Sequence, residues 1–207
     1  FAKEGASVVI GDVLEDVGKQ VEKEINRTGG ASVFVRLNVT RDSEWRNAVQ
    51  VAVQRFGKVD VLVNNAAIYR TVPVEHTTEE EWDEVMDVNV KGAFLGTRQV
   101  IPAMRRAGGG SIINISSMGG LVAIGPGGAY AVSKGGLRLL TKHTAMQHAN
   151  DGIRANAIYP GPIETEMFAS SLTNLPARSD RNLWFSAGAA CGAAGPCAAA
   201  DDDYAFV

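Results

Sequence analysis

The sequence lacks most of the features that mark specialised classes of protein. It has no block of basic residues and its net charge is −3, which argues against nucleic acid as a partner. No apolar run approaches the roughly 20 residues that cross a bilayer, so we expect no membrane span. The two cysteines, Cys191 and Cys197, have no His or Cys partners at metal-ligand spacing, so we expect neither a metal site nor a disulfide. No signal-peptide pattern is present, and a reduced, cytoplasmic protein is the default expectation.

What is present fits one globular domain spanning residues 1–207. The chain has 45% hydrophobic and 21% charged residues, which is ordinary for a folded protein of this length. Apolar runs typical of buried strands alternate with segments of helical periodicity. The expected strands are 7–10, 31–37, 59–63, 112–115 and 152–158, and the expected helices are 13–28, 40 or 42 to 56, 79–106 and 130–150. This alternation predicts an α/β fold with a doubly wound parallel sheet.

The stretch 110–136 holds the strongest chemical pattern. An apolar strand ends at Ser117, a glycine-rich loop follows, and a helix begins near Tyr130. Tyr130 and Lys134 are four residues apart and therefore share a helix face, where the ammonium is expected to lower the pKa of the phenol. A serine hydroxyl beside them could hold an alcohol or carbonyl oxygen. An isolated Tyr-x-x-x-Lys is usually an ordinary helix surface, but the strand and serine before it favour a catalytic site.

Ser117, Tyr130 and Lys134 in this spacing resemble the catalytic set of the short-chain dehydrogenase/reductase family, especially its members similar to oxoacyl-carrier-protein reductases. The resemblance runs from Phe1 to about Met167. It implies a Rossmann-like fold and hydride transfer between a nicotinamide and an alcohol or carbonyl substrate. Tyr130 would be the general acid/base, Lys134 would also hold the nicotinamide ribose, and Ser117 would position the substrate oxygen. Asn89, a polar residue on an apolar helical stripe, would kink its helix and support a proton relay through water; the alternative is a hydrogen-bonded core asparagine.

The cofactor expectations combine residue chemistry with the same resemblance. Asp12 ends the strand 7–10 and could bind the adenosine ribose, and because no Arg or Lys follows it, NAD is expected rather than NADP. The alternative role for Asp12 is the N-cap of the next helix. The other positions implied by the family are Asn38 and Val39 beside the adenine, Asn65 and Ala66 in the Asn-Asn-Ala-Ala turn, Tyr130, Lys134, and the Pro-Gly loop with Pro160, Gly161, Ile163 and Thr165.

The sequence departs from the family pattern in four places. The turn Thr-Gly-x-x-x-Gly-x-Gly is absent, as is the final strand, so we expect a fold that is incomplete at both ends. The first missing strand would lie between the strands ending at Asp12 and Val63. Residues 177–200 form an atypical segment rich in Ala and Gly, which is either the product of two compensating reading errors or a genuine substrate lid. Where the family usually has Asn-Asn-Ala-Gly, this sequence has Ala67 in place of the glycine.

The sequence leaves the substrate open among sugars, steroids, cyclic alcohols and oxoacyl thioesters, although a preference for NAD would favour alcohol oxidation. The resemblance implies a homotetramer built on the helices around Asn89 and Tyr130. Two alternatives to an active enzyme remain: a non-catalytic dinucleotide-binding protein, and an inactive piece of the same fold.

Overall fold

The computed structural model describes residues 1–122, 125, 127–163 and 165 of the 207-residue chain. The strands are β1 (Ser7–Asp12), β2 (Ala31–Arg36), β3 (Val61–Asn64), β4 (Gly110–Ile115) and β5 (Ile153–Ile158). The α-helices are α1 (Glu15–Arg27), α2 (Asp42–Phe56), α3 (Glu79–Met86), α4 (Gly92–Ala107) and α5 (Gly128–Gln147). The atypical segment 177–200 and the residues after it lie outside the described part.

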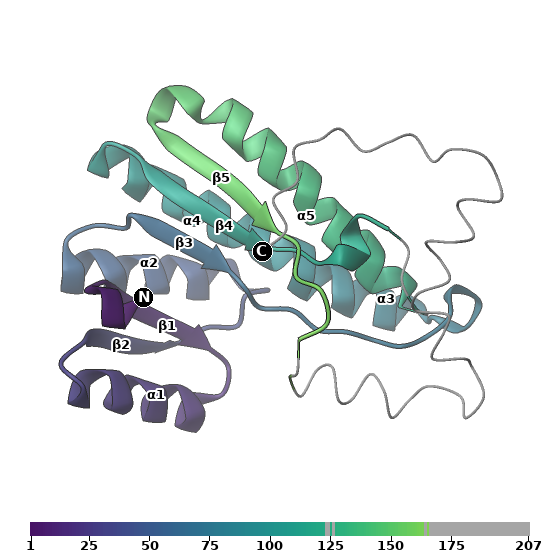
Figure 1. Cartoon of the computed structure of the whole chain (residues 1–207), viewed down its shortest axis with the longest axis horizontal. Helices are drawn as coiled ribbons and strands as arrows, with labels where there is room; N and C mark the ends of the chain where they lie inside the picture. Colours follow the sequence, from purple (N-terminus) through teal and green to yellow (C-terminus); the bar gives the residue numbers. More distant parts are fainter. Residues whose placement is uncertain (123–124, 126, 164, 166–207) are drawn as a thin grey trace.

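All strand pairs in the described residues are parallel. β1 pairs with β2, and β4 pairs with β3 on one side and with β5 on the other. A helix follows each of the first four strands, as a parallel sheet requires for its crossover connections (Figure 1). The predicted α/β fold with a parallel, Rossmann-like sheet is therefore confirmed.

The sheet is divided between β1 and β3. The strand order is β1-β2 in one group and β3-β4-β5 in the other, with no ladder between the two groups in the described part of the chain. In Figure 1, β1 lies on the side of β3 that is opposite to β4. Val61 at the start of β3 is 48% exposed. The division falls at the position where the sequence predicted a missing strand, between the strands that end near Asp12 and Val63.

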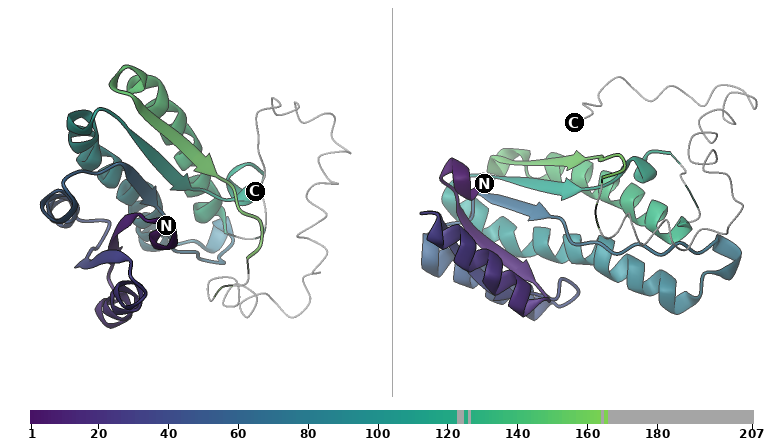
Figure 2. Two further views of the ribbon diagram at one scale, coloured as in Figure 1. Left: turned by 60° about the vertical axis from the view of Figure 1, so that its left-hand side comes forward. Right: turned by 60° about the horizontal axis from the view of Figure 1, so that its bottom comes forward.

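Helices cover both faces of the β1-β2 pair. Phe34 of β2 packs directly on Gly18 of α1, where a Cβ would overlap the phenyl ring. The next residue, Val35, belongs instead to a core that contains Trp45 of α2. Because successive strand residues point to opposite faces, α1 and α2 must lie on opposite sides of these strands (Figure 2).

One hydrophobic core joins the two groups of strands. It includes Val35 of β2 and Leu37 just after that strand, and Leu62 and Ile112 from β3-β4, with Met104 of α4 fully buried among them. Helices α2 and α4 therefore hold together the two parts of the divided sheet. Among the described residues, no helix combines the length and apolar character that a bilayer crossing requires.

The helix predicted over 79–106 is interrupted at Asn89. α3 begins with a capping box in which Thr78 accepts a hydrogen bond from the Glu81 N–H and the Glu81 side chain accepts one from the Thr78 N–H. A π-helical turn over Asp87–Lys91 then separates α3 from α4. Such turns insert one extra residue into a helix, so the helix is irregular at the residue where a kink was predicted.

Two helix starts differ from the sequence expectations. The N-cap of α2 is Arg41 rather than Thr40 or Asp42, because the Thr40 hydroxyl donates instead to Asn38 Oδ1 at 2.8 Å. α5 begins at Gly128, two residues before Tyr130, and therefore places Tyr130 within its first turn.

Candidate active site

The residues singled out from the sequence lie after the carboxyl ends of the strands. Because these strands are parallel, their carboxyl ends share one edge of the sheet, which is where α/β folds bind their ligands (Figure 1). Asp12 ends β1, Asn38 and Val39 follow β2, Asn65 and Ala66 follow β3, Ser117 follows β4, and Pro160, Gly161, Ile163 and Thr165 follow β5. Asn89, Tyr130 and Lys134 reach the same region from the π-helical turn and α5.

The Ser117 side chain lies close enough to the Tyr130 phenol to act on it and lower its pKa. Ser117 also caps the short 3-10 turn Met118–Gly120, accepting from the Gly119 N–H at 3.1 Å. This turn lies directly on α5, since a Cβ on Gly120 would be 2.6 Å from the carbonyl carbon of Lys134. The absence of a side chain at Gly120 thus allows the strand end that carries Ser117 to approach the helix that carries Tyr130.

Lys134 is a buried cation with 2% of its surface exposed. Its Nζ donates to the carbonyl of Ile115 at 2.7 Å and lies 5.5 Å from the centroid of the Tyr130 ring. Burial disfavours the charged form and lowers the pKa of Lys134 to about 8. The ammonium is therefore held beside the phenol, at a pKa close to neutrality.

The pKa of Tyr130 moves in the opposite direction from the sequence expectation. Burial of the phenol raises its pKa, and the Ser117 side chain opposes that rise. The expectation considered only the ammonium, whereas the structure places the phenol in a partly buried position where the phenolate loses hydration.

Asn89 is 1% exposed and its side-chain amide is fully used. Its Oδ1 accepts from the Ile68 N–H at 2.8 Å, and its Nδ2 donates to the Ile68 carbonyl at 2.9 Å and to Ser133 Oγ at 3.0 Å. Ser133 in turn donates to the Tyr130 carbonyl at 2.7 Å. Asn89 is thus a hydrogen-bonded core asparagine, as one interpretation held, and it also connects the loop after β3 to the helix that carries Tyr130 and Lys134.

Asp12 is exposed at the end of β1 and does not cap α1. Its Oδ1 accepts from the Leu14 N–H at 2.9 Å, while α1 begins only at Glu15 with Leu14 as its N-cap residue. Within the described residues, the second carboxylate oxygen of Asp12 makes no hydrogen bond. Asp12 therefore stabilises the turn after β1 and retains an acceptor for a hydroxyl group.

Asn38 and Val39, which lie just beyond β2, make most of their contacts within the protein. Asn38 Oδ1 accepts from the Thr40 N–H at 3.0 Å, and the Val39 carbonyl accepts from Trp45 Nε1 at 3.0 Å. The Val39 side chain packs on Gly92 at the start of α4. These contacts fix the shape of the loop at the sheet edge.

The Pro-Gly loop after β5 is tied to the loop after β4. The Met118 N–H donates to the Pro160 carbonyl at 3.1 Å, which places the loop beside the Ser117 turn. Gly161 and Ile163 are exposed, Ile163 by 57%, and the Thr165 hydroxyl lies 3.4 Å from the Ile163 carbonyl. Ile163 therefore lies at the surface of this edge of the sheet.

Sequence reasoning missed a buried polar chain behind the site. Asn64 Nδ2 donates to Asn114 Oδ1 at 2.8 Å, and Asn114 Nδ2 donates to Thr141 Oγ1 at 2.8 Å, linking β3, β4 and α5. The Asn64 Oδ1 atom is buried without a hydrogen-bond partner among the described residues. The signal was available, because Asn114 interrupts an otherwise apolar strand and needs a polar partner.

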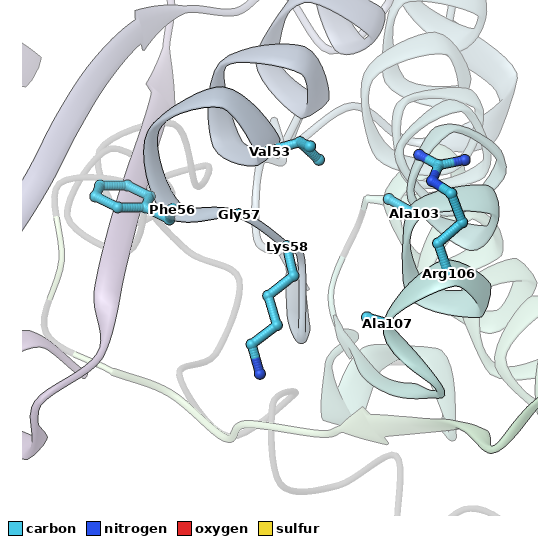
Figure 3. A pocket seen from close by; sticks show the side chains of 7 residues that line it. All are labelled: Val53, Phe56, Gly57, Lys58, Ala103, Arg106 and Ala107. Atoms are coloured by element: carbon cyan, nitrogen blue, oxygen red, sulfur yellow. The ribbon is translucent and has the colours of Figure 1, made fainter.

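A cavity of about 450 Å³ lies away from these residues, between α2 and α4 (Figure 3). Its lining consists of Val53, Phe56, Gly57, Lys58, Ala103, Arg106 and Ala107. These residues are at the carboxyl ends of the two helices, next to the amino ends of β3 and β4. The cavity is thus at the opposite edge of the sheet from Ser117 and Tyr130, and we do not assign it to the reaction.

The chain resembles several curated dehydrogenases. It is 45% identical over 167 residues to cyclopentanol dehydrogenase from Comamonas sp. (strain NCIMB 9872), covering 81% of this chain and 67% of that protein. It is 45% identical to trans-4-hydroxycyclohexanecarboxylate dehydrogenase from Sinomonas cyclohexanicum, with 82% and 67% covered. It is 44% identical to 3-alpha-(or 20-beta)-hydroxysteroid dehydrogenase from Mycobacterium bovis, with 79% and 62% covered. The chain therefore spans about two-thirds of the length of these relatives.

A solved structure and a family model point to the same group of dehydrogenases as these relatives. The crystal structure of a gluconate 5-dehydrogenase from Burkholderia cenocepacia J2315, in complex with NADP and tartrate, superposes with a TM-score of 0.79 at 34% identity, covering 85% of this chain and 69% of that one. The family model described as short chain dehydrogenase matches residues 1–175. The chain belongs to the short-chain dehydrogenase family.

Proposed function

We propose that the natural protein containing this chain is an NAD-dependent dehydrogenase that oxidises a secondary alcohol to a ketone, and that Tyr130 is its general acid/base. The observation that carries this proposal is that the Ser117 hydroxyl and the Tyr130 phenol lie together beside the buried Lys134 ammonium. The three groups meet at the carboxyl edge of a parallel sheet, the usual ligand site of this architecture.

Each of the three side chains has a distinct part in the proposed reaction. The Ser117 hydroxyl donates to the substrate oxygen and fixes its position. Tyr130, as phenolate, takes the proton from the alcohol hydroxyl while the hydride leaves the carbinol carbon. The Lys134 ammonium stabilises the phenolate. A bound nicotinamide dinucleotide supplies the hydride acceptor. In the reverse direction, Tyr130 returns the proton to the carbonyl oxygen.

Asn89 acts on this group through its neighbours. By holding both backbone groups of Ile68 and the Ser133 hydroxyl, it fixes the loop after β3 against α5. We propose that the π-helical turn at Asn89 supports a water-mediated proton path toward Lys134.

The residues that are present fit a nicotinamide dinucleotide. The free carboxylate oxygen of Asp12 suits the adenosine ribose diol, and an unscreened carboxylate there disfavours the extra phosphate of NADP. At the other end, Lys134 would hold the nicotinamide ribose and the Ile163 backbone would hold the carboxamide. The solved gluconate 5-dehydrogenase contains NADP, so the preference for NAD rests on Asp12 in this chain. The remaining contacts of the proposed site are Asn38, Val39, Asn65, Ala66, Pro160, Gly161 and Thr165.

A cyclic secondary alcohol is the substrate class that the relatives favour. Those named above act on cyclopentanol, a hydroxycyclohexane carboxylate and hydroxysteroids.

We also propose a cytoplasmic homotetramer in which the outer faces of α4 and α5 pair between subunits. The exposed apolar residues Phe94, Leu139 and Met146 on these helices support such pairing, with Leu139 and Met146 exposed by 70% and 73%.

Substitution of Tyr130 separates this proposal from a non-catalytic dinucleotide-binding protein. In the full-length natural protein, Tyr130→Phe removes the proton acceptor and keeps the ring, so kcat for cyclopentanol oxidation is expected to fall by about 100-fold or more. The dissociation constant for NAD, measured by fluorescence titration, is expected to stay within about twofold. Unchanged turnover in Tyr130→Phe would exclude the proposed mechanism.

A further inference from the structure

An aromatic side chain outside the proposed catalytic group packs against Tyr130. The rings of Tyr69 and Tyr130 meet edge to face, with their centroids 4.7 Å apart and their planes at 78°. Tyr69 lies five residues beyond the end of β3, in the loop that Asn89 holds. Both rings are partly buried. Tyr69 is therefore next to the phenol on which the reaction is proposed to depend.

The position of Tyr69 is fixed on both sides along the chain. The preceding residue, Ile68, has its N–H and its carbonyl bound by the Asn89 amide. The following residue, Arg70, forms an ion pair with Glu84 of α3 at 2.8 Å. A loop side chain held in this way keeps its place when a ligand arrives, which is what a specific binding wall requires.

The Tyr69 ring fits against the start of α5 because residue 127 is a glycine. A Cβ at Gly127, immediately before α5, would overlap the Tyr69 ring. The first turn of α5 and the loop after β3 therefore fit together around this aromatic side chain. The loop backbone also approaches the start of α5, since the same Cβ would lie 3.0 Å from the carbonyl oxygen of Arg70.

The hydroxyl of Tyr69 has no hydrogen-bond partner among the described residues. Burial raises the pKa of Tyr69, and the neighbouring Tyr130 adds to the rise, so the group stays a neutral phenol. A partly buried tyrosine usually places its hydroxyl on a partner. The side chain thus offers an apolar ring and an available O–H beside the reacting phenol.

We propose that Tyr69 is a specificity-determining residue whose ring forms a wall of the substrate site and packs against the carbon ring of an alicyclic secondary alcohol. This inference rests on the proposed function, because it requires the substrate to lie against Tyr130. A saturated ring covers more of an aromatic face than a flexible open chain does, and it loses less conformational freedom on binding. Tyr69 therefore selects the shape of the substrate, while Ser117 and Tyr130 act on its oxygen.

The test compares two substitutions on two alcohols in the full-length natural protein. Tyr69→Leu removes the aromatic face, whereas Tyr69→Phe keeps it and removes only the hydroxyl. For cyclopentanol, Tyr69→Leu is expected to raise KM by about three- to tenfold and leave kcat within about twofold, as the loss of one aromatic contact predicts. For the open-chain pentan-2-ol, KM is expected to change by less than about twofold. Tyr69→Phe is expected to match the wild type on both alcohols.

Other outcomes overturn the inference separately from the proposed function. An equal rise in KM for both alcohols, a loss of kcat with KM unchanged, or no effect of Tyr69→Leu would show that the ring does not select the substrate. If the wild type oxidises no secondary alcohol, the proposed function fails. The ring contact is then decided by saturation-transfer NMR with cyclopentanone: a signal lost in Tyr69→Leu and kept in Tyr69→Phe supports it, and any other pattern contradicts it.

Discussion

At the scale of single residues, Lys134 is a lysine in a buried position that disfavours its charged form. Its pKa falls from 10.5 to about 8 because burial penalises the ammonium. Below pH 8 the group is protonated in both the folded and unfolded states. Between pH 8 and 10.5 the unfolded chain binds the proton more strongly, so stability rises with pH, by up to about 3 kcal/mol for this group.

Lys134→Met should abolish that rise. The free energy of unfolding of the full-length natural protein, measured in urea at pH 7, 8, 9 and 10, is expected to increase with pH more steeply in the wild type than in the variant. Lys142→Met, which alters an exposed lysine two turns further along α5, is the control and should follow the wild type. Identical pH slopes in Lys134→Met and the wild type would show that the ammonium is not buried.

The role of Asn89 can be tested by comparing its substitution with that of Asn26, which makes similar hydrogen bonds far from the site. Asn89→Ala leaves the Ile68 N–H and carbonyl without partners and is expected to cost about 2–4 kcal/mol of stability, with a loss of kcat. Asn26 makes the same kind of paired contact, with the Ser32 N–H and carbonyl, at the distant α1–β2 junction. Asn26→Ala should therefore lower the thermal midpoint and leave kcat unchanged. Equal effects of the two variants on kcat would remove Asn89 from the account.

At the scale of elements, the approach of the β4 loop to α5 determines how Ser117 meets Tyr130. A Cβ on Gly120 would lie 2.6 Å from the Lys134 carbonyl carbon and 2.8 Å from its oxygen, so Gly120→Ala must push the two elements apart. We expect kcat to fall by about tenfold or more, because hydrogen-bond geometry at the reacting group is lost.

Gly135 of α5, which faces Gly120 across this contact, provides the control substitution. A Cβ on Gly135 would meet only the Gly120 carbonyl, at 3.6 Å, which is ordinary contact. Gly135→Ala should keep kcat near the wild-type value and stabilise the helix by up to about 1 kcal/mol. If steady-state kinetics showed both variants equally active, close approach at Gly120 would not matter to the reaction.

The same elements show what the sequence could predict. Strand and helix positions followed from apolar periodicity, and the burial of Asn89 followed from a polar residue on an apolar stripe. The start of α2 did not, because the Thr40 hydroxyl found a nearer acceptor in Asn38. The pKa direction of Tyr130 did not either, because burial depends on packing that no local pattern contains. Tyr69 was missed for a related reason: its contact with Tyr130 joins residues 61 positions apart in the sequence.

At the scale of the whole molecule, the divided sheet determines which parts of the chain are least protected. β4 has partners on both sides, whereas β1 and β3 each have one in the described structure. In hydrogen-exchange mass spectrometry of the 207-residue chain, peptides from β1 and β3 are expected to exchange faster than those from β4. Equal protection in all three would mean that the free edges are paired in solution, by self-association or by another strand.

The most direct test of the account is the pH dependence of kcat/KM for cyclopentanol oxidation by the full-length natural protein and its Tyr130→Phe variant. Only the phenolate can accept the alcohol proton, so the wild-type value is expected to rise with pH until Tyr130 is ionised. The variant should be slow and should lack this rise. A variant that keeps both the rate and the pH dependence would contradict the claim that Tyr130 moves the proton.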